Sequence, residues 1–108
     1  MGAVVRQTAG AVNIRIHAEA EAELEDAHQY YLGIDERLSA ALLREVARLL
    51  AQISSYPLGC KLLGTGQLRR CTLKRFPYVV IYEPRVSEIM VIAFAHAKRL
   101  PGYWQDRH

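Results

Sequence analysis

Two segments in the first half of the chain repeat apolar residues at the spacing of amphipathic helices. The first, residues 18–32, has an apolar face made of Ala20, Leu24, Ala27 and Tyr31. The second begins after the N-cap residue Asp35, runs to about residue 54 and carries a stripe of Leu38, Leu42, Val46, Leu49 and Ile53, widened by Leu43 and Leu50. Because only Gly33 and Ile34 separate the segments, we expect an antiparallel helical hairpin that covers one face of a sheet.

Four other segments have the pattern of strands. Residues 12–16 alternate apolar and polar side chains. A glycine-containing loop, Pro57–Gln67, leads to strands at Leu68–Leu73, Tyr78–Glu83 and Ile89–Ala95, the last apolar enough to be covered on both faces. The short links between the last three strands predict an antiparallel meander. The sequence therefore predicts an α+β domain of order β-α-α-β-β-β, with a twisted antiparallel sheet and the two-helix hairpin packed on one face.

The length of 108 residues is that of a single domain. We expect residues 1–11 to form a flexible tail and residues 12–108 to form the domain. No run of apolar residues is long enough to span a membrane, and the N-terminus lacks a secretory pattern, which favours a cytoplasmic protein. In a reducing compartment Cys60 and Cys71 are expected to be free, partly buried thiols, with a disulfide between them as the open alternative.

Charge is divided unevenly along the chain. Residues 1–55 carry five Lys and Arg against eight Asp and Glu, whereas residues 56–108 carry nine against three. The segment Arg69–Tyr82 also interleaves cations with aromatic residues, a combination typical of surfaces that bind nucleic acid or another anionic partner. The alternative is that these cations simply line a solvated face of the sheet.

Two stretches of the second half carry a family resemblance. The run RRCTLKRFPYVVIY, followed after a short turn by IMVIAFAHAKRLPGYWQDR, resembles the toxins of the RelE/ParE superfamily of bacterial type II toxin–antitoxin systems, often labelled plasmid-stabilisation proteins. The segment AEAEAELEDAHQYY is similar to the first helix of that superfamily, so the likeness extends from about Asn13 to Arg107. The resemblance implies the fold predicted above and a growth-inhibiting toxin that is masked by a cognate antitoxin in a hetero-oligomer.

The superfamily contains two mechanisms. RelE-like toxins inhibit translation by cleaving mRNA on the ribosome, as metal-independent endoribonucleases, and ParE-like toxins bind and poison DNA gyrase. Our first hypothesis from the sequence is the RNA-binding mRNA interferase. The alternatives are the gyrase poison and a degenerate relative that only binds its antitoxin. No metal site or cofactor is suggested by the sequence.

Cleavage of RNA by its own 2′-hydroxyl needs a proton-transfer group and a cation beside the phosphate. His96 is the candidate general acid or base and Arg70 the candidate phosphate ligand, which makes these two the predicted catalytic residues. Further candidates for binding RNA or another target are Arg69, Lys74, Arg75, Tyr78, Tyr82, Arg99 and Tyr103. The alternatives are that His96 is a hydrogen-bonded histidine at a strand end and that the arginines are surface cations or partners of antitoxin carboxylates.

One departure from the nuclease pattern concerns the strand 78–82. Ribosome-dependent members that resemble this chain often carry an arginine there, and Val79 stands about where that arginine is expected. This difference favours a gyrase-type or non-catalytic toxin, unless Arg70 compensates from the neighbouring strand.

Overall fold

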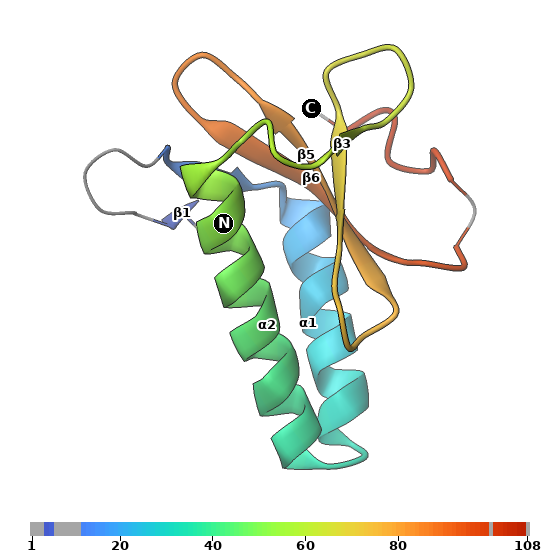
Figure 1. Ribbon diagram of the computed structural model, residues 1–108. Helices are drawn as coiled ribbons and strands as arrows, with labels where there is room; N and C mark the ends of the chain where they lie inside the picture. Colours follow the sequence, from blue (N-terminus) through green and yellow to red (C-terminus); the bar gives the residue numbers. More distant parts are fainter. Residues whose placement is uncertain (1–3, 6–11, 100, 108) are drawn as a thin grey trace.

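A computed structural model describes residues 4–5, 12–99 and 101–107. Helices α1 (Ala18–Leu32) and α2 (Glu36–Ser55) form an antiparallel hairpin that packs on one face of a sheet, as Figure 1 shows. Both helices lie where the sequence predicts them. Side chains cap their first turns, since His17 Nδ1 accepts the Glu19 N–H at 3.1 Å and Asp35 Oδ1 accepts the Arg37 N–H at 2.8 Å.

The sheet has the strand order β1-β2-β6-β5-β4-β3. Its strands are β1 (Val4–Val5), β2 (Ile14–Ile16), β3 (Lys61–Leu62), β4 (Arg69–Thr72), β5 (Tyr78–Pro84) and β6 (Ile89–His96). The α+β class, the β-α-α-β-β-β order and the antiparallel meander β4-β5-β6 are confirmed. Strand β2 runs parallel to β6, so the sheet is mixed, whereas we expected an antiparallel sheet. The sequence leaves open where this first strand lies in the sheet.

Two short strands correct the expected boundaries. Val4–Val5 pairs with β2, although we expected it to belong to a flexible tail. Residues 1–3 and 6–11 of that expected tail lie outside the described residues. Strand β3 lies within Pro57–Gln67, which we expected to be a loop, and it forms the edge of the sheet beyond β4.

A disulfide joins Cys60 and Cys71, whose Cα atoms lie 5.6 Å apart. This corrects the expectation of two free thiols. The pairing of β3 with β4 explains the bond: Lys61 lies opposite Arg70, so the antiparallel register brings Cys60 opposite Cys71. The spacing of the two cysteines along the chain does not predict this disulfide, because the bond depends on where β3 forms.

Strand β6 lies in the middle of the hydrophobic core. On its helix side, Val91 and Phe94 belong to a cluster that includes Tyr82 and buried residues of both helices. On the opposite side, Ile92 and Ala95 pack in a second cluster that contains Trp104. Trp104 is only 6 % exposed and brings the C-terminal segment against the second face of the sheet. The near-continuous apolar character of β6 is thus explained by cover on both faces.

The closed end of the helical hairpin extends beyond the sheet (Figure 1). Leu42 of the α2 stripe is fully buried, whereas Leu38, one turn earlier, is 39 % exposed. Other apolar residues at this end are also exposed: Tyr30, Leu32 and Ile34. The stripe therefore packs only where the sheet lies opposite it.

Candidate functional site

The alternation of side chains along β4 separates its two arginines. Cys71 and Leu73 belong to the helix-side core, so Arg69, two residues before Cys71, points to the same side. Arg70 lies opposite Ile81, which packs in the cluster on the other face. Arg69 and Arg70 are adjacent in the sequence, but their side chains therefore lie on opposite faces of the sheet.

Arg69 and Tyr82 hold the chain that leads into β3. Arg69 Nη1 donates to the carbonyl oxygens of Leu58 at 3.1 Å and Cys60 at 2.6 Å. Tyr82 is completely buried and its hydroxyl donates to the Pro57 carbonyl at 2.7 Å. Tyr82 is thus a core residue, which corrects the expectation that it stacks on a ligand. Arg69 is likewise engaged by the protein's own backbone.

Lys74 and Arg75 lie in the turn between β4 and β5, which is fixed by a carboxylate of α2. Glu45 is 4 % exposed, and its Oε2 accepts the backbone N–H groups of Lys74 and of Arg75, the latter at 3.2 Å. Arg75 Nε also lies 3.6 Å from Glu45 Oε1. Burial by itself raises the pKa of Glu45, but these bonds and the Arg75 charge outweigh it, so that the pKa is lowered. The side chains of Lys74 and Arg75 remain exposed.

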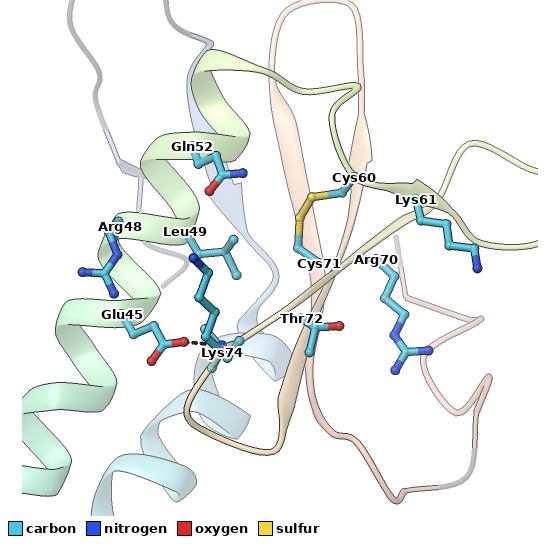
Figure 2. A pocket seen from close by; sticks show the side chains of 11 residues that line it. Glu45, Arg48, Leu49, Gln52, Cys60, Lys61, Arg70, Cys71, Thr72 and Lys74 are labelled. Carbon is cyan, nitrogen blue, oxygen red and sulfur yellow. Dashed lines mark hydrogen bonds between the residues drawn. A yellow bond between two sulfur atoms is a disulfide. The ribbon is translucent and has the colours of Figure 1, made fainter.

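A groove of about 380 Å³ lies between α2 and the edge strands (Figure 2). Leu49 and Leu73 contribute apolar surface, and the Cys60–Cys71 disulfide forms part of the wall. Four cationic residues border it: Arg48, Lys61, Arg70 and Lys74. Its one bordering carboxylate, Glu45, is already bound to the β4-β5 turn. The groove therefore has the charge and the apolar content to receive an acidic, partly apolar segment of another chain.

A smaller pocket of about 140 Å³ brings together some of the residues predicted to be catalytic. Arg70, His96 and Arg99 all border it, on the sheet face opposite the helices. Its floor includes Val79, which is 4 % exposed, so the position expected to carry an arginine in nucleases is a buried apolar residue. The phosphate-binding cation of the nuclease pattern is absent from this position.

The imidazole of His96 is held on the helix side of the sheet. His96 pairs in register with Tyr78 and contacts its ring edge-on, with the ring centroids 5.2 Å apart. Tyr78 in turn stacks on Phe94, a residue of the helix-side core, at 4.7 Å. His96 Nδ1 accepts the Lys98 N–H at 3.1 Å. The imidazole and the Arg70 side chain therefore leave the sheet on opposite faces, and His96 has the geometry of a hydrogen-bonded histidine at a strand end.

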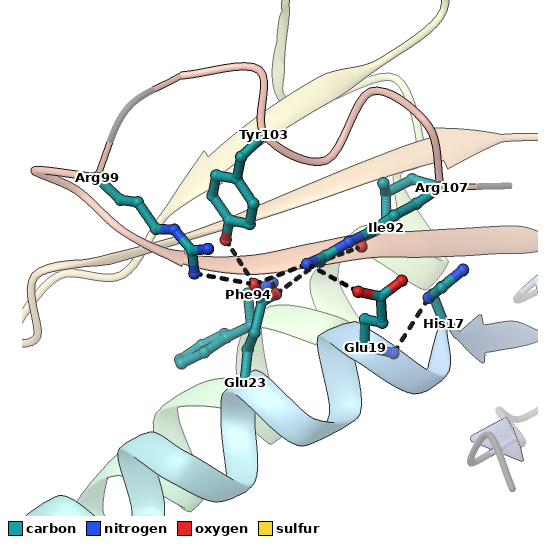
Figure 3. Close-up of polar contacts among 8 residues, drawn as sticks. All are labelled: His17, Glu19, Glu23, Ile92, Phe94, Arg99, Tyr103 and Arg107. Carbon is teal, nitrogen blue, oxygen red and sulfur yellow. Dashed lines mark hydrogen bonds and ion pairs between the residues drawn. The ribbon is translucent and has the colours of Figure 1, made fainter.

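The C-terminal segment is tied to α1 through Glu23 (Figure 3). Tyr103 donates its hydroxyl to Glu23 Oε2 at 2.7 Å, and Arg107 donates through Nη1 to Oε1 at 2.9 Å and through Nη2 to Oε2 at 3.1 Å. Arg99 Nη1 lies 3.5 Å from Glu23 Oε2, and its Cζ lies 3.6 Å from the centre of the Tyr103 ring. Arg99 and Tyr103, both predicted to bind a target, are thus partners of the half-buried carboxylate of Glu23 in the free protein.

Glu23 and Arg107 also complete the edge of β6 where β2 stops. The parallel pairing of β2 with β6 ends at Val91. Beyond it the Phe94 N–H donates to Glu23 Oε1 at 3.0 Å, and the Ile92 carbonyl accepts from Arg107 Nη1 at 3.2 Å. The Glu23 and Arg107 side chains thus satisfy two backbone groups of β6 that have no neighbouring strand to bond with.

The cluster shifts the pKa values of its acidic members. Burial raises the pKa of Glu23, but the bonds from Arg107, Tyr103 and the Phe94 N–H outweigh it and lower the pKa overall. Burial and the bond to Glu23 raise the pKa of Tyr103 to about 12. Sequence reasoning missed Glu23 and Arg107. The sequence does indicate that Glu23 lies beside the apolar face of α1, because it comes three residues after the buried Ala20 and four before the buried Ala27.

The predicted site residues consequently do not form one site. Arg70 borders both the groove and the smaller pocket, and Lys74 and Arg75 lie in the turn beside the groove. His96 and Tyr78 lie at the end of β6, and Arg99 and Tyr103 surround Glu23. Arg69 and Tyr82 stabilise the chain before β3. Among the described residues, no helix is both long and apolar enough to cross a membrane, and no three His, Cys, Asp or Glu residues are grouped to hold a metal ion.

Comparisons with known proteins identify one matching family model and a solved structure of similar fold. The family model described as the ParE toxin of the type II toxin–antitoxin system parDE matches residues 14–101. A solved structure titled as the chromosomal ParDE toxin–antitoxin system from P. aeruginosa has a TM-score of 0.71 at 13 % identity, covering 83 % of this chain and 100 % of that chain. At that identity the likeness shows the fold. The search of curated proteins gave no match.

Proposed function

The chain belongs to the family of ParE toxins of type II toxin–antitoxin systems, and we propose that it arrests growth by binding its target and not by cleaving RNA. The observation that carries this proposal is the placement of His96 and Arg70 on opposite faces of the sheet. Cleavage by a 2′-hydroxyl requires a proton-transfer group and a cation within reach of one phosphate. The buried Val79 between them offers neither.

The proposed target is DNA gyrase. Binding poisons of this superfamily do not need a nuclease site, so the loss of an arginine at the position of Val79 has no consequence for such a mechanism. Arg99 and Tyr103 present a cation–aromatic pair in the C-terminal segment, where a protein target can make contact. The toxin acts in the cytoplasm, where gyrase is found.

The proposed inhibitor is an antitoxin whose acidic, amphipathic segment lies in the groove between α2 and β4. Carboxylates of that segment pair with Arg48, Lys61 and Lys74, and its apolar side chains meet Leu49. Interfaces of complementary charge associate rapidly, which suits an inhibitor that must mask a toxin soon after synthesis.

Ribosome-dependent mRNA cleavage is the second candidate, and one observation favours it. Arg70, His96 and Arg99 border the same small pocket, so a backbone rearrangement at the end of β6 that turns the imidazole to this face would bring a proton-transfer group toward two arginines. This mechanism requires His96 to leave its contact with Tyr78.

Two assays on the same variants separate these functions. We expect the purified chain to inhibit supercoiling by gyrase, His96→Ala to retain that inhibition, and induced cells to show no new mRNA ends by primer extension. Arg70→Ala should likewise retain the inhibition of gyrase, and Arg44→Ala, on the exposed face of α2, is the matched control for the loss of an arginine. New mRNA ends that vanish in His96→Ala, with a loss of about two to four orders of magnitude in cleavage rate and no effect on gyrase, would overturn the proposal.

The antitoxin is sought in the reading frame that abuts the gene for this chain. We expect its product to co-purify with the toxin and to restore growth when both are expressed. Failure of that product to bind the purified toxin would contradict the proposed partner.

A further inference from the structure

The Cys60–Cys71 disulfide occupies a position that neither the proposed target nor the proposed antitoxin explains. It joins the chain just before β3 to the edge of β4, and both cysteines border the groove (Figure 2). Cys71 is 4 % exposed, whereas Cys60 is partly accessible to solvent. The bond is therefore reachable from outside through one of its two sulfur atoms.

Residues 60–63 form this wall of the groove, and few contacts hold it besides the disulfide. The bonds from Arg69 to the Leu58 and Cys60 carbonyls and from Tyr82 to the Pro57 carbonyl fix the chain up to Cys60 and leave the residues after it to the sheet pairing alone.

Strand β3 contributes two paired residues, Lys61 and Leu62, and the turn behind it is closed by the Leu63 N–H donating to the Leu68 carbonyl at 2.8 Å. Leu62 is 49 % exposed. The main core contains Cys60 only as a partly buried member, while α1, α2, β5 and β6 pack against one another independently of β3. Opening the disulfide would thus release the wall without removing the core.

We propose that Cys60–Cys71 is a thiol–disulfide switch that fixes the β3 wall of the groove when oxidised and releases it when reduced. Its consequence for partner binding rests on the proposed function, which places an antitoxin in the groove and the toxin in the cytoplasm. Disulfides in that compartment are seldom permanent, because dithiol proteins of the thioredoxin class and glutathione reduce them.

The reducing step requires an external dithiol. Its thiolate attacks Sγ of Cys60, forming a bond between the external sulfur and Cys60 while the Cys60–Cys71 bond breaks. The electron pair leaves on Sγ of Cys71, which takes a proton from water. The second thiolate of the reductant then attacks the first external sulfur, releases Cys60 as a thiolate that is protonated, and closes the reductant's own disulfide. Both electrons come from the dithiol, which is oxidised as the protein is reduced.

The oxidised form is expected to bind its partner more tightly. A wall already fixed in the free protein loses less conformational freedom on binding than a wall that must be ordered at that moment. Lys61, one of the groove cations, lies next to Cys60 and is held in position by the same bond. Reduction removes this preorganisation and leaves the charges of the groove unchanged.

Hydrogen exchange measured by mass spectrometry tests the switch without any partner. The chain is compared before and after dithiothreitol, together with the double variant Cys60→Ser/Cys71→Ser as the matched control. We expect reduction to speed amide exchange about tenfold in residues 60–63 and to leave α1, α2, β5 and β6 unchanged. The double variant should exchange its amides at the rates of the reduced chain, and dithiothreitol should not change those rates. Equal exchange in both forms, or exchange that rises throughout the helices, would overturn the switch.

Calorimetric titration with the product of the abutting reading frame tests the consequence. We expect the oxidised chain to bind about tenfold more tightly than the reduced chain or the double variant. Equal affinities would overturn control of binding by the disulfide. An absence of binding in every form would instead overturn the proposed antitoxin partner, while hydrogen exchange still decides whether the wall is redox-sensitive.

Discussion

Glu23 links three parts of the molecule through one side chain. It lies on α1, accepts the backbone N–H of Phe94 on β6, and binds Tyr103 and Arg107 of the C-terminal segment. A carboxylate this enclosed is costly unless its oxygens are fully bonded, and here donors from two distant segments satisfy them. The anchoring of the C-terminal segment therefore depends strongly on the ionised form of one residue.

Replacing Glu23 with Gln should destabilise the protein in a pH-dependent way. The folded-state pKa of Glu23 lies below its ordinary value of 4.5, so its stabilisation is complete above that pH and is lost as the pH falls through the folded-state pKa. We expect Glu23→Gln to lower the free energy of unfolding by about 2 kcal/mol at pH 7 and by much less in acid. Urea denaturation at pH 7 and near pH 3 measures the difference.

Glu21→Gln is the control for this prediction. Glu21 lies on the same helix, and within the described ranges its side chain makes no hydrogen bond or ion pair. Its replacement should change stability little at either pH. A Glu23→Gln effect that stays constant between the two pH values would contradict the role assigned to the ionised carboxylate.

The elements follow the hydrophobic pattern closely, but packing decides which part of each pattern is used. Leu38 and Leu42 belong to the same stripe of α2, yet only Leu42 is buried in the core. The apolar periodicity predicts which face of the helix is buried, but it does not predict how much of the helix length packs against the core. The exposed end of the hairpin, Tyr30–Leu38, follows from the shorter length of the sheet (Figure 1).

Alanine substitutions at these two leucines should differ sharply. Leu42→Ala creates a cavity in the core and is expected to lower the free energy of unfolding by about 3 kcal/mol. Leu38→Ala should lower it by less than about 1 kcal/mol, because its side chain is already partly in water. Thermal or urea denaturation measures both, and equal losses would show that the hairpin end is packed.

At the scale of the whole molecule, the charge split of the sequence becomes a cationic groove. Lys61, Arg70 and Lys74 come from the basic second half, and Arg48 joins them from α2. The acidic residue that shares this groove, Glu45, is bound to backbone N–H groups and to Arg75. The groove therefore retains a positive potential that attracts an acidic partner.

Reversing one groove charge should slow association with the antitoxin. We expect Arg48→Glu to reduce the association rate constant about tenfold at low ionic strength, with a smaller effect in high salt. Stopped-flow mixing with the product of the abutting reading frame measures the rate. Arg44→Glu makes the same change in net charge on an exposed face of α2 that does not border the groove. Equal slowing by both variants would point to net charge and not to the groove.

The sequence predicted much of the fold and less of the site. The chemistry of a proton-transfer group and a phosphate-binding cation predicts His96 and Arg70 as a catalytic pair, but cross-strand register assigns their side chains to opposite faces. Tyr82 was read as a stacking residue and is instead completely buried, bound to Pro57. Strand alternation is visible in a sequence, whereas the identity of each face depends on what packs there.

The sequence alone determined the helices and the meander, because these follow from local periodicity, capping and short connections. The family likeness came from the motif residues of the last strands and of the first helix. Only the tertiary structure decided that β2 lies parallel to β6, that Cys60 meets Cys71, and that Glu23 receives Arg107. Each of these contacts joins residues from different elements, and a pairing between elements is set by the packing of the whole core. Local pattern therefore specified the parts, and long-range packing specified which side chains share a surface.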